Sequence, residues 1–315
     1  MTNKNALVLG CSGQDGSLLS KSLLNKGYKV IGLARTKSNS VKNHIKLGIE
    51  KDVEIKLGDI QNSKTIEKII SDHQPDAIFN LAAQSSVGKS FYEPLDTIQG
   101  IVNGTLNILE VSRQMEYSGT IFFAGTSEMF GNTHIAADIN HKHNPISPYA
   151  IAKQTSFNLV KFYREVHKLK CLTGVLFNHE SHLRHENFVT QKIIKAVKNI
   201  NKNNTQKLKL GNIEVIRDWG WAPEYIEAIQ LITKSEKTKD HVICSGKTNS
   251  LKLFIQKTFS YYGLDWREHT VIDKSLFRPN EILKNYGNPD PLFVDTGWRA
   301  NVDFDSLIHK LIDLS

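Results

Sequence analysis

A tyrosine and a lysine four residues apart, Tyr149 and Lys153, have types and a spacing that point to chemistry. In a helix, residues four apart lie on one face. Ser147 suits the N-cap and Pro148 the first helical position, which predicts that a helix starts here. A lysine ammonium beside a phenol favours the phenolate and lowers the tyrosine pKa, as a base at neutral pH requires. A surface helix with a half-buried tyrosine can carry the same spacing, so the pair needs support from its surroundings.

That support begins upstream, where an apolar strand is expected at residues 120–124. It delivers three polar side chains at its carboxyl end: Thr126, Ser127 and Glu128. Glu128 fits two descriptions. It can serve as an acid/base carboxyl group, or it can be a carboxylate at a helix start, where the helix dipole favours it.

A glycine-rich loop opens the chain after an apolar run at residues 5–9. Gly10, Gly13 and Gly16 lie between this run and a helical repeat of leucines, and a second strand is expected at 28–34. This strand, turn, helix and strand order is the context of a dinucleotide site. Gly10 permits the tight turn, Gly13 lets the backbone approach the pyrophosphate, and Gly16 allows close packing of the helix.

The residues after the second strand indicate which dinucleotide binds. Sites that prefer NAD carry an acidic residue there, which binds the ribose 2′-hydroxyl. Here the strand is followed by Arg35, Lys37 and Ser38, without a carboxylate. A guanidinium can hold a 2′-phosphate, so the sequence predicts NADP as the cofactor.

Further strands are expected at 53–57, 77–81 and 171–177, with helices from Ser63 and over 97–114. Alternating strands and helices predict an α/β fold with a Rossmann-type, doubly wound parallel sheet. Ligands bind such sheets at the carboxyl ends of the strands, where the glycine loop and the segment 126–128 both fall. After Lys153 the alternation loosens. We therefore expect an NADP-binding domain over 1–177 and a smaller, partly interleaved C-terminal lobe over 178–315 for the substrate.

Composition restricts the function classes. The chain has 315 residues, 40% of them apolar and 23% charged, which is ordinary for a globular protein. No run of about 18 apolar residues predicts a membrane span, and the first residues lack a signal-peptide layout. Three separated cysteines make a disulfide framework improbable and favour a cytoplasmic location.

The net charge of +8 comes from lysine-rich stretches at 37–56 and 192–209. They lack a nucleic-acid-binding motif, so we expect no nucleic acid partner and a solvated or diphosphate-attracting surface instead. The segment His179-Glu180-Ser181-His182 has the wrong spacing for a helical zinc pair, and no metal site is expected.

Over nearly its whole length the chain resembles the GDP-mannose 4,6-dehydratase family of the extended short-chain dehydrogenase/reductase superfamily. The most specific shared segments are GQDGS (13–17), NLAAQSSV (80–87), TSEMFG (126–131), SPYAIAK (147–153), LFNHES (176–181), FVTQKI (188–193), LGN (210–212), RDWG (217–220) and RPNE (278–281). The glycine loop and the tyrosine–lysine pair are common to the superfamily. The NHES and FVTQKI segments followed by RDWG point to the dehydratases rather than to epimerase and reductase relatives.

The resemblance implies three sets of site residues. The catalytic set would be Thr126, Glu128, Tyr149 and Lys153. The NADP-binding set would be Gly10, Ser12, Gly13, Gln14, Asp15, Gly16, Arg35, Asp59, Ile60, Leu81, Ala82, Ala83, Gln84, Ser85, Lys153, His179 and Arg184. The residues that hold the nucleotide sugar would be Ser86, Asn178, Val189, Lys192, Arg217, Arg278 and Glu281. Surface ion pairs with Asp218 or Glu281 are an alternative role for the two arginines.

The chain departs from the family pattern at several places. A PRRG segment is usual after NHES, whereas here residues 182–185 read HLRH; Asp96 replaces a tyrosine near the cofactor. The loop after Arg35 is altered, and the region ahead of Arg278 is shorter. These differences bear on the sugar and on whether the protein is a homodimer or a homotetramer.

The expected activity is dehydration of GDP-mannose, or of a related GDP-sugar such as GDP-heptose, to the 4-keto-6-deoxy sugar. Hydride would pass internally from C4 to C6, so NADP would not be consumed. Two other activities are compatible with the same fold: a reductase or epimerase for GDP-4-keto-6-deoxy sugars, which has no need of Glu128, and a non-catalytic NADP-binding regulator.

Overall fold

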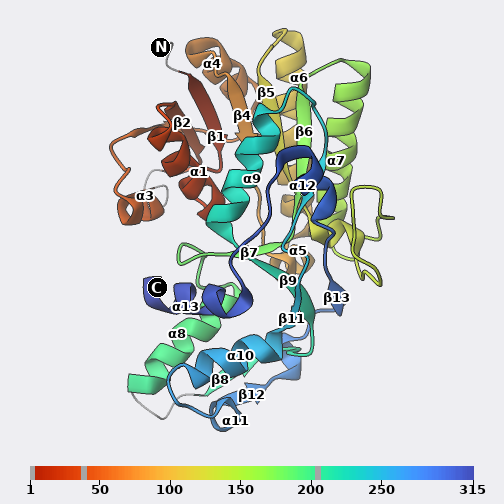
Figure 1. Ribbon diagram of the computed structural model, residues 1–315. Coiled ribbons are helices and arrows are strands. Elements are labelled where there is room, and N and C mark those ends of the chain that lie inside the picture. Colours follow the sequence, from red (N-terminus) through yellow and green to blue (C-terminus); the bar gives the residue numbers. More distant parts are fainter. Residues whose placement is uncertain (1–3, 37–40, 203–206) are drawn as a thin grey trace.

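A seven-stranded parallel sheet lies at the centre of the larger lobe (Figure 1). The computed structural model describes residues 4–36, 41–202 and 207–315. The strand order is β10-β6-β5-β4-β1-β2-β3. The bounds are β1 (Asn5–Leu9), β2 (Lys29–Ala34), β3 (Val53–Leu57), β4 (Ala77–Asn80), β5 (Thr120–Thr126), β6 (Cys171–Leu176) and β10 (His241–Ile243). The predicted doubly wound α/β fold is therefore confirmed.

Helices cover both faces of this sheet. On one face lie α1 (Gln14–Asn25), α9 (Ala222–Lys234) and α12 (Asp290–Thr296), and on the other lie α4 (Ser63–His73), α6 (Pro94–Gln114) and α7 (Pro148–Val166). Strand β1 serves both cores: Ala6 and Val8 pack toward the first set of helices, and Leu7 and Leu9 toward the second. This alternation explains why the strand is apolar throughout. Two short helices, α3 (Lys42–Leu47) and α5 (Val87–Tyr92), complete this lobe.

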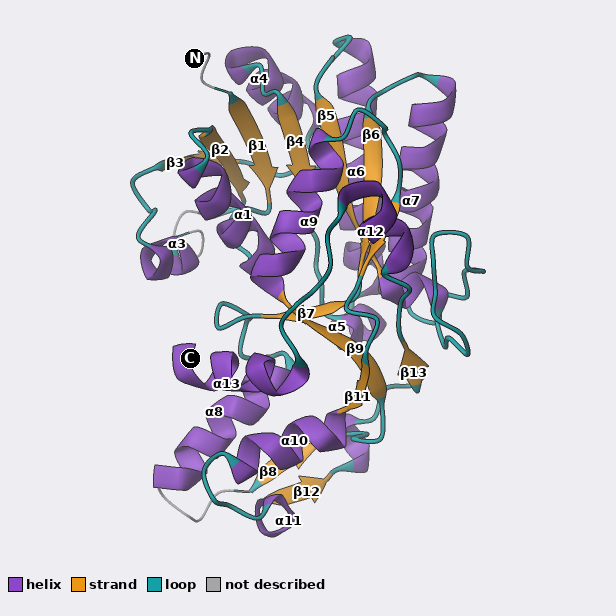
Figure 2. Cartoon of the chain, in the orientation of Figure 1, coloured by secondary structure: helices purple, strands orange, loops and turns teal. Residues whose placement is uncertain are grey.

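The smaller lobe surrounds a second apolar core. Its strands are β7 (Asn178–Glu180), β8 (Leu208–Leu210), β9 (Ile216–Trp221), β11 (Thr248–Ser250), β12 (Thr270–Ile272) and β13 (Lys284–Asn285). Its helices are α8 (Val189–Lys202), α10 (Leu251–Ser260), α11 (Trp266–His269), α13 (Phe304–Leu314) and the short 3₁₀ turn η2 (Lys274–Leu276). Figure 2 shows β7 and β9 at the junction of the lobes. From β9 the chain runs directly into α9 and then β10, which belong to the larger lobe.

Element bounds agree with the sequence expectations for β1 and β3 and differ by one to three residues elsewhere. Strand β5 runs two residues beyond 124, because its ladder with β6 continues to the pair Thr126–Leu176. Helix α6 begins at Pro94 rather than at 97, since proline suits the first helical turn. The predicted helix start is confirmed: Ser147 is the N-cap, its side chain accepts a hydrogen bond from the Ala150 amide, and Pro148 is the first helical residue.

Candidate active site

The glycine loop shapes one end of the site. Gly10 has φ +82°, and a Cβ there would lie 2.9 Å from the backbone of Ala82, just after the end of the neighbouring strand β4. A Cβ on Gly16 would lie 2.2 Å from the Gly10 carbonyl oxygen, so α1 packs tightly against the end of β1. Gly13 precedes α1 without a side-chain cap. The first amides of α1 thus remain available to an anion, as a pyrophosphate site requires.

A cavity of about 660 Å³ extends from this loop across the carboxyl ends of β2, β3 and β4. Its lining includes fifteen of the seventeen predicted NADP-binding residues, all except Lys153 and His179. Arg35 is exposed at the end of β2, where the predicted 2′-phosphate contact would form. Lys37 and Ser38, the other residues predicted for that contact, lie outside the described residues.

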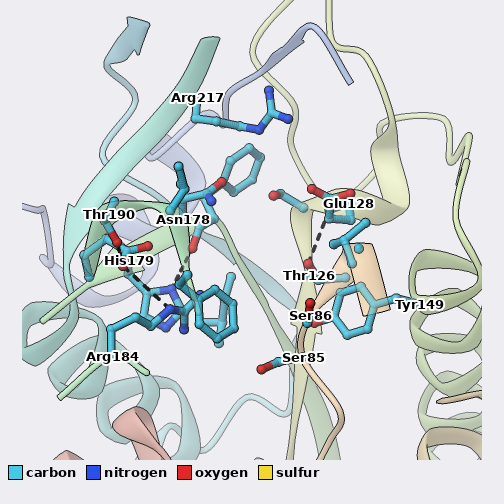
Figure 3. A pocket seen from close by; sticks show the side chains of 18 of the residues that line it. Ser85, Ser86, Thr126, Glu128, Tyr149, Asn178, His179, Arg184, Thr190 and Arg217 are labelled. Carbon is cyan, nitrogen blue, oxygen red and sulfur yellow. Dashed lines mark hydrogen bonds and ion pairs between the residues drawn. The ribbon is translucent and has the colours of Figure 1, made fainter. Parts of the chain in front are cut away.

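A second cavity, of about 430 Å³, adjoins the first and shares five lining residues with it: Asp15, Leu81, Ala83, Ser85 and Arg184. Its walls carry the two remaining cofactor residues, the four predicted catalytic residues and all seven predicted sugar-binding residues. In Figure 3, Thr126, Glu128 and Tyr149 lie on one side, facing Asn178, His179 and Arg184 on the other, with Arg217 at one end. Segments from both lobes therefore build one continuous site.

Sequence reasoning missed several residues that line this second cavity. Phe188 and Asn212 belong to the FVTQKI and LGN segments, so the motif match was a signal that could have identified them. Asn43, which supports the glycine loop without lining the cavity, had no such signal. Its side-chain amide donates to the carbonyl oxygens of Ser12 and Leu183 and ties the glycine loop to the smaller lobe.

Tyr149 and Lys153 lie on one face of α7, and the Lys153 Nζ is 5.9 Å from the centre of the tyrosine ring. The ammonium donates to the Ala124 carbonyl oxygen at 2.7 Å. Burial raises the pKa of Tyr149 to about 12, opposed in part by a hydrogen bond with Thr126. Burial also lowers the pKa of Lys153 to about 7, opposed by Asp15. The expected lowering of the tyrosine pKa is therefore not found in the chain alone: burial raises it, and Lys153 is not among the groups that shift it.

Glu128 lies on the short 3₁₀ turn η1 (Ser127–Phe130), directly after β5. Its backbone amide donates to the Thr126 Oγ1 at 3.3 Å. The carboxyl group is half-buried in the wall of the second cavity. Burial raises its pKa; Arg217 and Arg278 oppose that rise and Glu281 adds to it. A carboxyl group with a raised pKa can both accept and donate a proton near neutral pH.

Two arginines share one carboxylate at the end of the site. Arg217, only 5% exposed, donates to Glu281 Oε1 at 3.1 Å, and Arg278 donates to the same oxygen at 3.2 Å. The alternative ion pair of Arg217 with Asp218 is wrong: Asp218 instead accepts hydrogen bonds from the Ser245 and Gly246 amides. Two guanidinium groups face one carboxylate here, so this arginine cluster (Arg217, Arg278 and Glu281) carries a net positive charge. Such a charge suits a diphosphate.

The imidazole of His179 links the two lobes beside the glycine loop. Its Nδ1 is 2.7 Å from the Phe177 carbonyl oxygen and its Nε2 is 3.0 Å from Asp15 Oδ2. Both partners accept hydrogen bonds only, so both ring nitrogens carry protons. Consistently, the pKa of His179 is raised by Asp15 against the effect of burial, and that of Asp15 is lowered by His179 against its own burial. The ring stacks on Tyr225 with centroids 4.8 Å apart.

Within residues 4–36, 41–202 and 207–315, no group of three or more histidine, cysteine or acidic side chains is arranged to hold a metal. The same part of the chain contains no helix long and apolar enough to cross a membrane. Cys11, Cys171 and Cys244 are buried and free.

The match to known proteins covers almost the whole molecule. The family model for GDP-mannose 4,6 dehydratase matches residues 7–311. GDP-mannose 4,6 dehydratase 1 of Arabidopsis thaliana is 38% identical over 98% of this chain and 89% of its own length. The chain belongs to the GDP-mannose 4,6-dehydratase family. The family model thus covers every predicted site residue.

Solved structures of more distant sequence share the fold. The dTDP-glucose 4,6-dehydratase of Bacillus anthracis in complex with NAD superposes with a TM-score of 0.85 at 17% identity, covering 99% of this chain and 96% of the other. The RMD protein of Pseudomonas aeruginosa complexed with NADPH gives a TM-score of 0.80 at 19% identity and 99% coverage of both chains.

Proposed function

We propose that the chain is an NADP-dependent GDP-mannose 4,6-dehydratase, a hydro-lyase that forms the 4-keto-6-deoxy sugar. The single observation that carries this proposal is Glu128, a carboxyl group of raised pKa that shares a cavity with Thr126 and Tyr149. Dehydration across C5 and C6 needs such a group, whereas a reductase or an epimerase does not. The family membership and its named relatives support GDP-mannose as the substrate.

The glycine loop and the cavity beside it fit a nicotinamide dinucleotide. The open amides at the start of α1 would hold its pyrophosphate, and Asp59 and Ile60 would line the adenosine side. Arg35 supports NADP over NAD, because no acidic side chain stands at that position. When bound, the nicotinamide would accept a hydride from sugar C4 and return it to C6.

The protein's own groups would move the protons. Tyr149 Oη, held by Thr126, would take the proton of the C4 hydroxyl as that carbon is oxidised; it would do so as the phenolate, which the positive charge of a bound nicotinamide would favour against the effect of burial. The resulting ketone acidifies C5–H, which Glu128 would remove. Glu128 would then protonate the C6 hydroxyl, so that the C6–O bond breaks and water leaves. As C6 is reduced, C5 gains a proton, and Tyr149 would supply it from the one that it took from the C4 hydroxyl, which restores the starting state.

Substrate binding would rely on the smaller lobe. Arg217 and Arg278 would hold the diphosphate, and Lys192 lies on the same cavity wall with its Nζ 2.7 Å from the Lys209 carbonyl oxygen. Asn178 and Ser86 line the region between this cluster and Tyr149 and would orient the sugar.

We also infer that the protein works in the cytoplasm as a homodimer or homotetramer. Adjacent helices α6 and α7 expose large apolar side chains, which a second copy would cover: Leu106, Ile151, Phe162 and Val166. Sedimentation of the purified protein tests this inference. A monomer at micromolar concentration contradicts it.

Mass spectrometry of GDP-mannose incubated with the purified protein and substoichiometric NADP tests the activity. We expect the product to have lost one water, without net formation of NADPH, and we expect NAD to support less turnover. An unchanged GDP-mannose together with conversion of GDP-heptose would move the substrate to a heptose. NADPH-consuming conversion of a GDP-4-keto-6-deoxy sugar would replace the dehydratase assignment with a reductase.

A further inference from the structure

The turn that carries Glu128 is held at both ends by one side chain from the smaller lobe. Asn285, 2% exposed, donates from Nδ2 to the carbonyl oxygens of Ser127 at 3.1 Å and Gly131 at 2.7 Å. Because both partners are acceptors, the nitrogen must face them, which fixes the orientation of the amide. These contacts bridge more than 150 positions of sequence. The sequence around Glu128 does not predict these contacts.

The same short strand also reaches the arginine cluster. Asn285 is the register partner of Arg217 in the parallel pairing of β13 with β9. Four residues before Asn285, the Glu281 carboxylate accepts the hydrogen bond from Arg217. One segment, 281–285, thus contacts both the turn of Glu128 and the arginine expected to bind the diphosphate. The distance between these two groups is therefore set largely by the placement of β13.

On the basis of the proposed dehydratase function, we propose that Asn285 is a positioning residue for the elimination of water. Its amide aims the Glu128 carboxyl group at C5 and C6 of a sugar whose diphosphate is bound by Arg217. It does not act on the oxidation at C4. The groups for that step are anchored elsewhere: Tyr149 and Lys153 lie on α7, and Lys153 is tied to Ala124.

A purely structural role is the alternative, and other contacts make the two roles separable. The Thr133 amide donates to the Lys284 carbonyl oxygen at 2.9 Å, and the Tyr286 amide donates to Thr133 Oγ1 at 3.0 Å. Asn132 Oδ1 accepts from the Lys284 amide at 3.1 Å. These bonds keep β13 beside the segment 131–133 when the Asn285 amide is removed. Loss of the amide should therefore loosen the turn without unfolding the lobe.

Asn285→Leu tests the proposal because leucine has the same branching as asparagine and no donor. We expect kcat for GDP-mannose to fall about 10- to 100-fold, the range caused by small misplacements of reacting groups. We expect KM to stay close to the wild-type value. Reduced cofactor should accumulate on the enzyme during turnover, since oxidation at C4 would outrun elimination. Asn288→Ala is the matched control. It removes a hydrogen bond from the Asp290 amide to the Asn288 side chain, three residues beyond Asn285 and away from the turn.

The outcomes separate this proposal from the proposed function. An inactive wild-type protein refutes the function itself. If the wild type is active and Asn285→Leu retains its kcat, or loses oxidation and elimination in parallel, Asn285 has no positioning role. Hydrogen–deuterium exchange of the protein alone gives an independent measurement. Amides within 127–131 should exchange faster in Asn285→Leu than in wild type, and unchanged exchange there overturns the proposal whatever the turnover.

Discussion

Glu128→Gln is the substitution that most directly tests the proposed chemistry. Glutamine has nearly the same shape and leaves the half-buried position occupied, so the fold should persist. It cannot accept the C5 proton or donate one to the C6 hydroxyl. The substitution also removes a negative charge that interacts with Arg217 and Arg278. The substitution therefore stops elimination while leaving Tyr149 and Thr126 in place for oxidation at C4.

The expected loss can be estimated from the double use of this carboxyl group. General acid–base catalysis contributes about 10²- to 10⁴-fold per positioned group. Since one group performs both transfers here, we expect kcat to fall at least about 10³-fold, or roughly 4 kcal/mol of transition-state stabilisation. The wild-type rate should rise with pH through the raised pKa of Glu128, because the ionised form must start the elimination. In Glu128→Gln this acid limb should disappear.

The assay follows water loss by mass spectrometry and cofactor reduction by absorbance in the same reaction. Glu128→Gln should give enzyme-bound reduced cofactor without dehydrated product. Glu165→Gln is a control, since Glu165 is exposed on α7 and is 3.9 Å from Lys161 in a surface ion pair. A Glu128→Gln protein that dehydrates GDP-mannose within about tenfold of wild type would refute the acid/base role, as a tenfold change is only about 1.4 kcal/mol.

Three further substitutions test the binding groups. Arg217→Lys loses the planar guanidinium and should raise KM for GDP-mannose about tenfold, measured by initial rates; an unchanged KM contradicts a diphosphate contact. His179→Gln removes the ion pair with Asp15 and should lower the free energy of unfolding by about 1.5–3 kcal/mol. The pKa of His179 is raised, so the difference in unfolding free energy between the two proteins should be largest below the ordinary pKa of histidine and shrink as pH rises through the raised value. The pKa of Asp15 is lowered, so the same difference should also shrink when the pH falls far enough to protonate Asp15. Denaturant titrations of both proteins across pH measure it, and a constant difference contradicts the ion pair. Gly10→Ala forces a Cβ to within 2.9 Å of the Ala82 backbone at φ +82° and should cost about 1–3 kcal/mol and weaken NADP binding, measured by thermal unfolding and titration; wild-type values for both would contradict the tight turn.

The regular part of the fold was predictable because local signals and the tertiary structure agree there. Strands β1 and β3 were located without error from short apolar runs next to glycine or loop signals. For β5 a neighbouring strand caused the shift of its end, since its last pair is Thr126 with Leu176. Such pairing depends on a strand about fifty residues away in sequence, which periodicity within β5 cannot reveal.

The electrostatics of the site were predicted less well. Helical spacing correctly placed Lys153 on the face of Tyr149, but it carried no information on how deeply both are buried. Desolvation therefore reversed the expected direction of the tyrosine pKa. Of the two ion-pair partners considered for the arginines, Asp218 and Glu281, only Glu281 is confirmed, and it pairs with Arg217 from 64 residues further on as well as with Arg278. In a strand, neighbours point to opposite faces, so adjacent residues are poor candidates for a shared ion pair.

The acid/base chemistry of the site also depends on how the two lobes share it. The larger lobe supplies Glu128, Tyr149 and Lys153 on elements that the sheet fixes by itself. The smaller lobe supplies Arg217 and Glu281, whose opposite charges move the pKa of Glu128 in opposite directions. The pKa of Glu128 thus depends on how the two lobes are placed relative to each other and not on any single segment. A fold alone leaves the reaction open. In this chain, the reaction would be determined by how β13 holds the arginine cluster against the turn that carries Glu128.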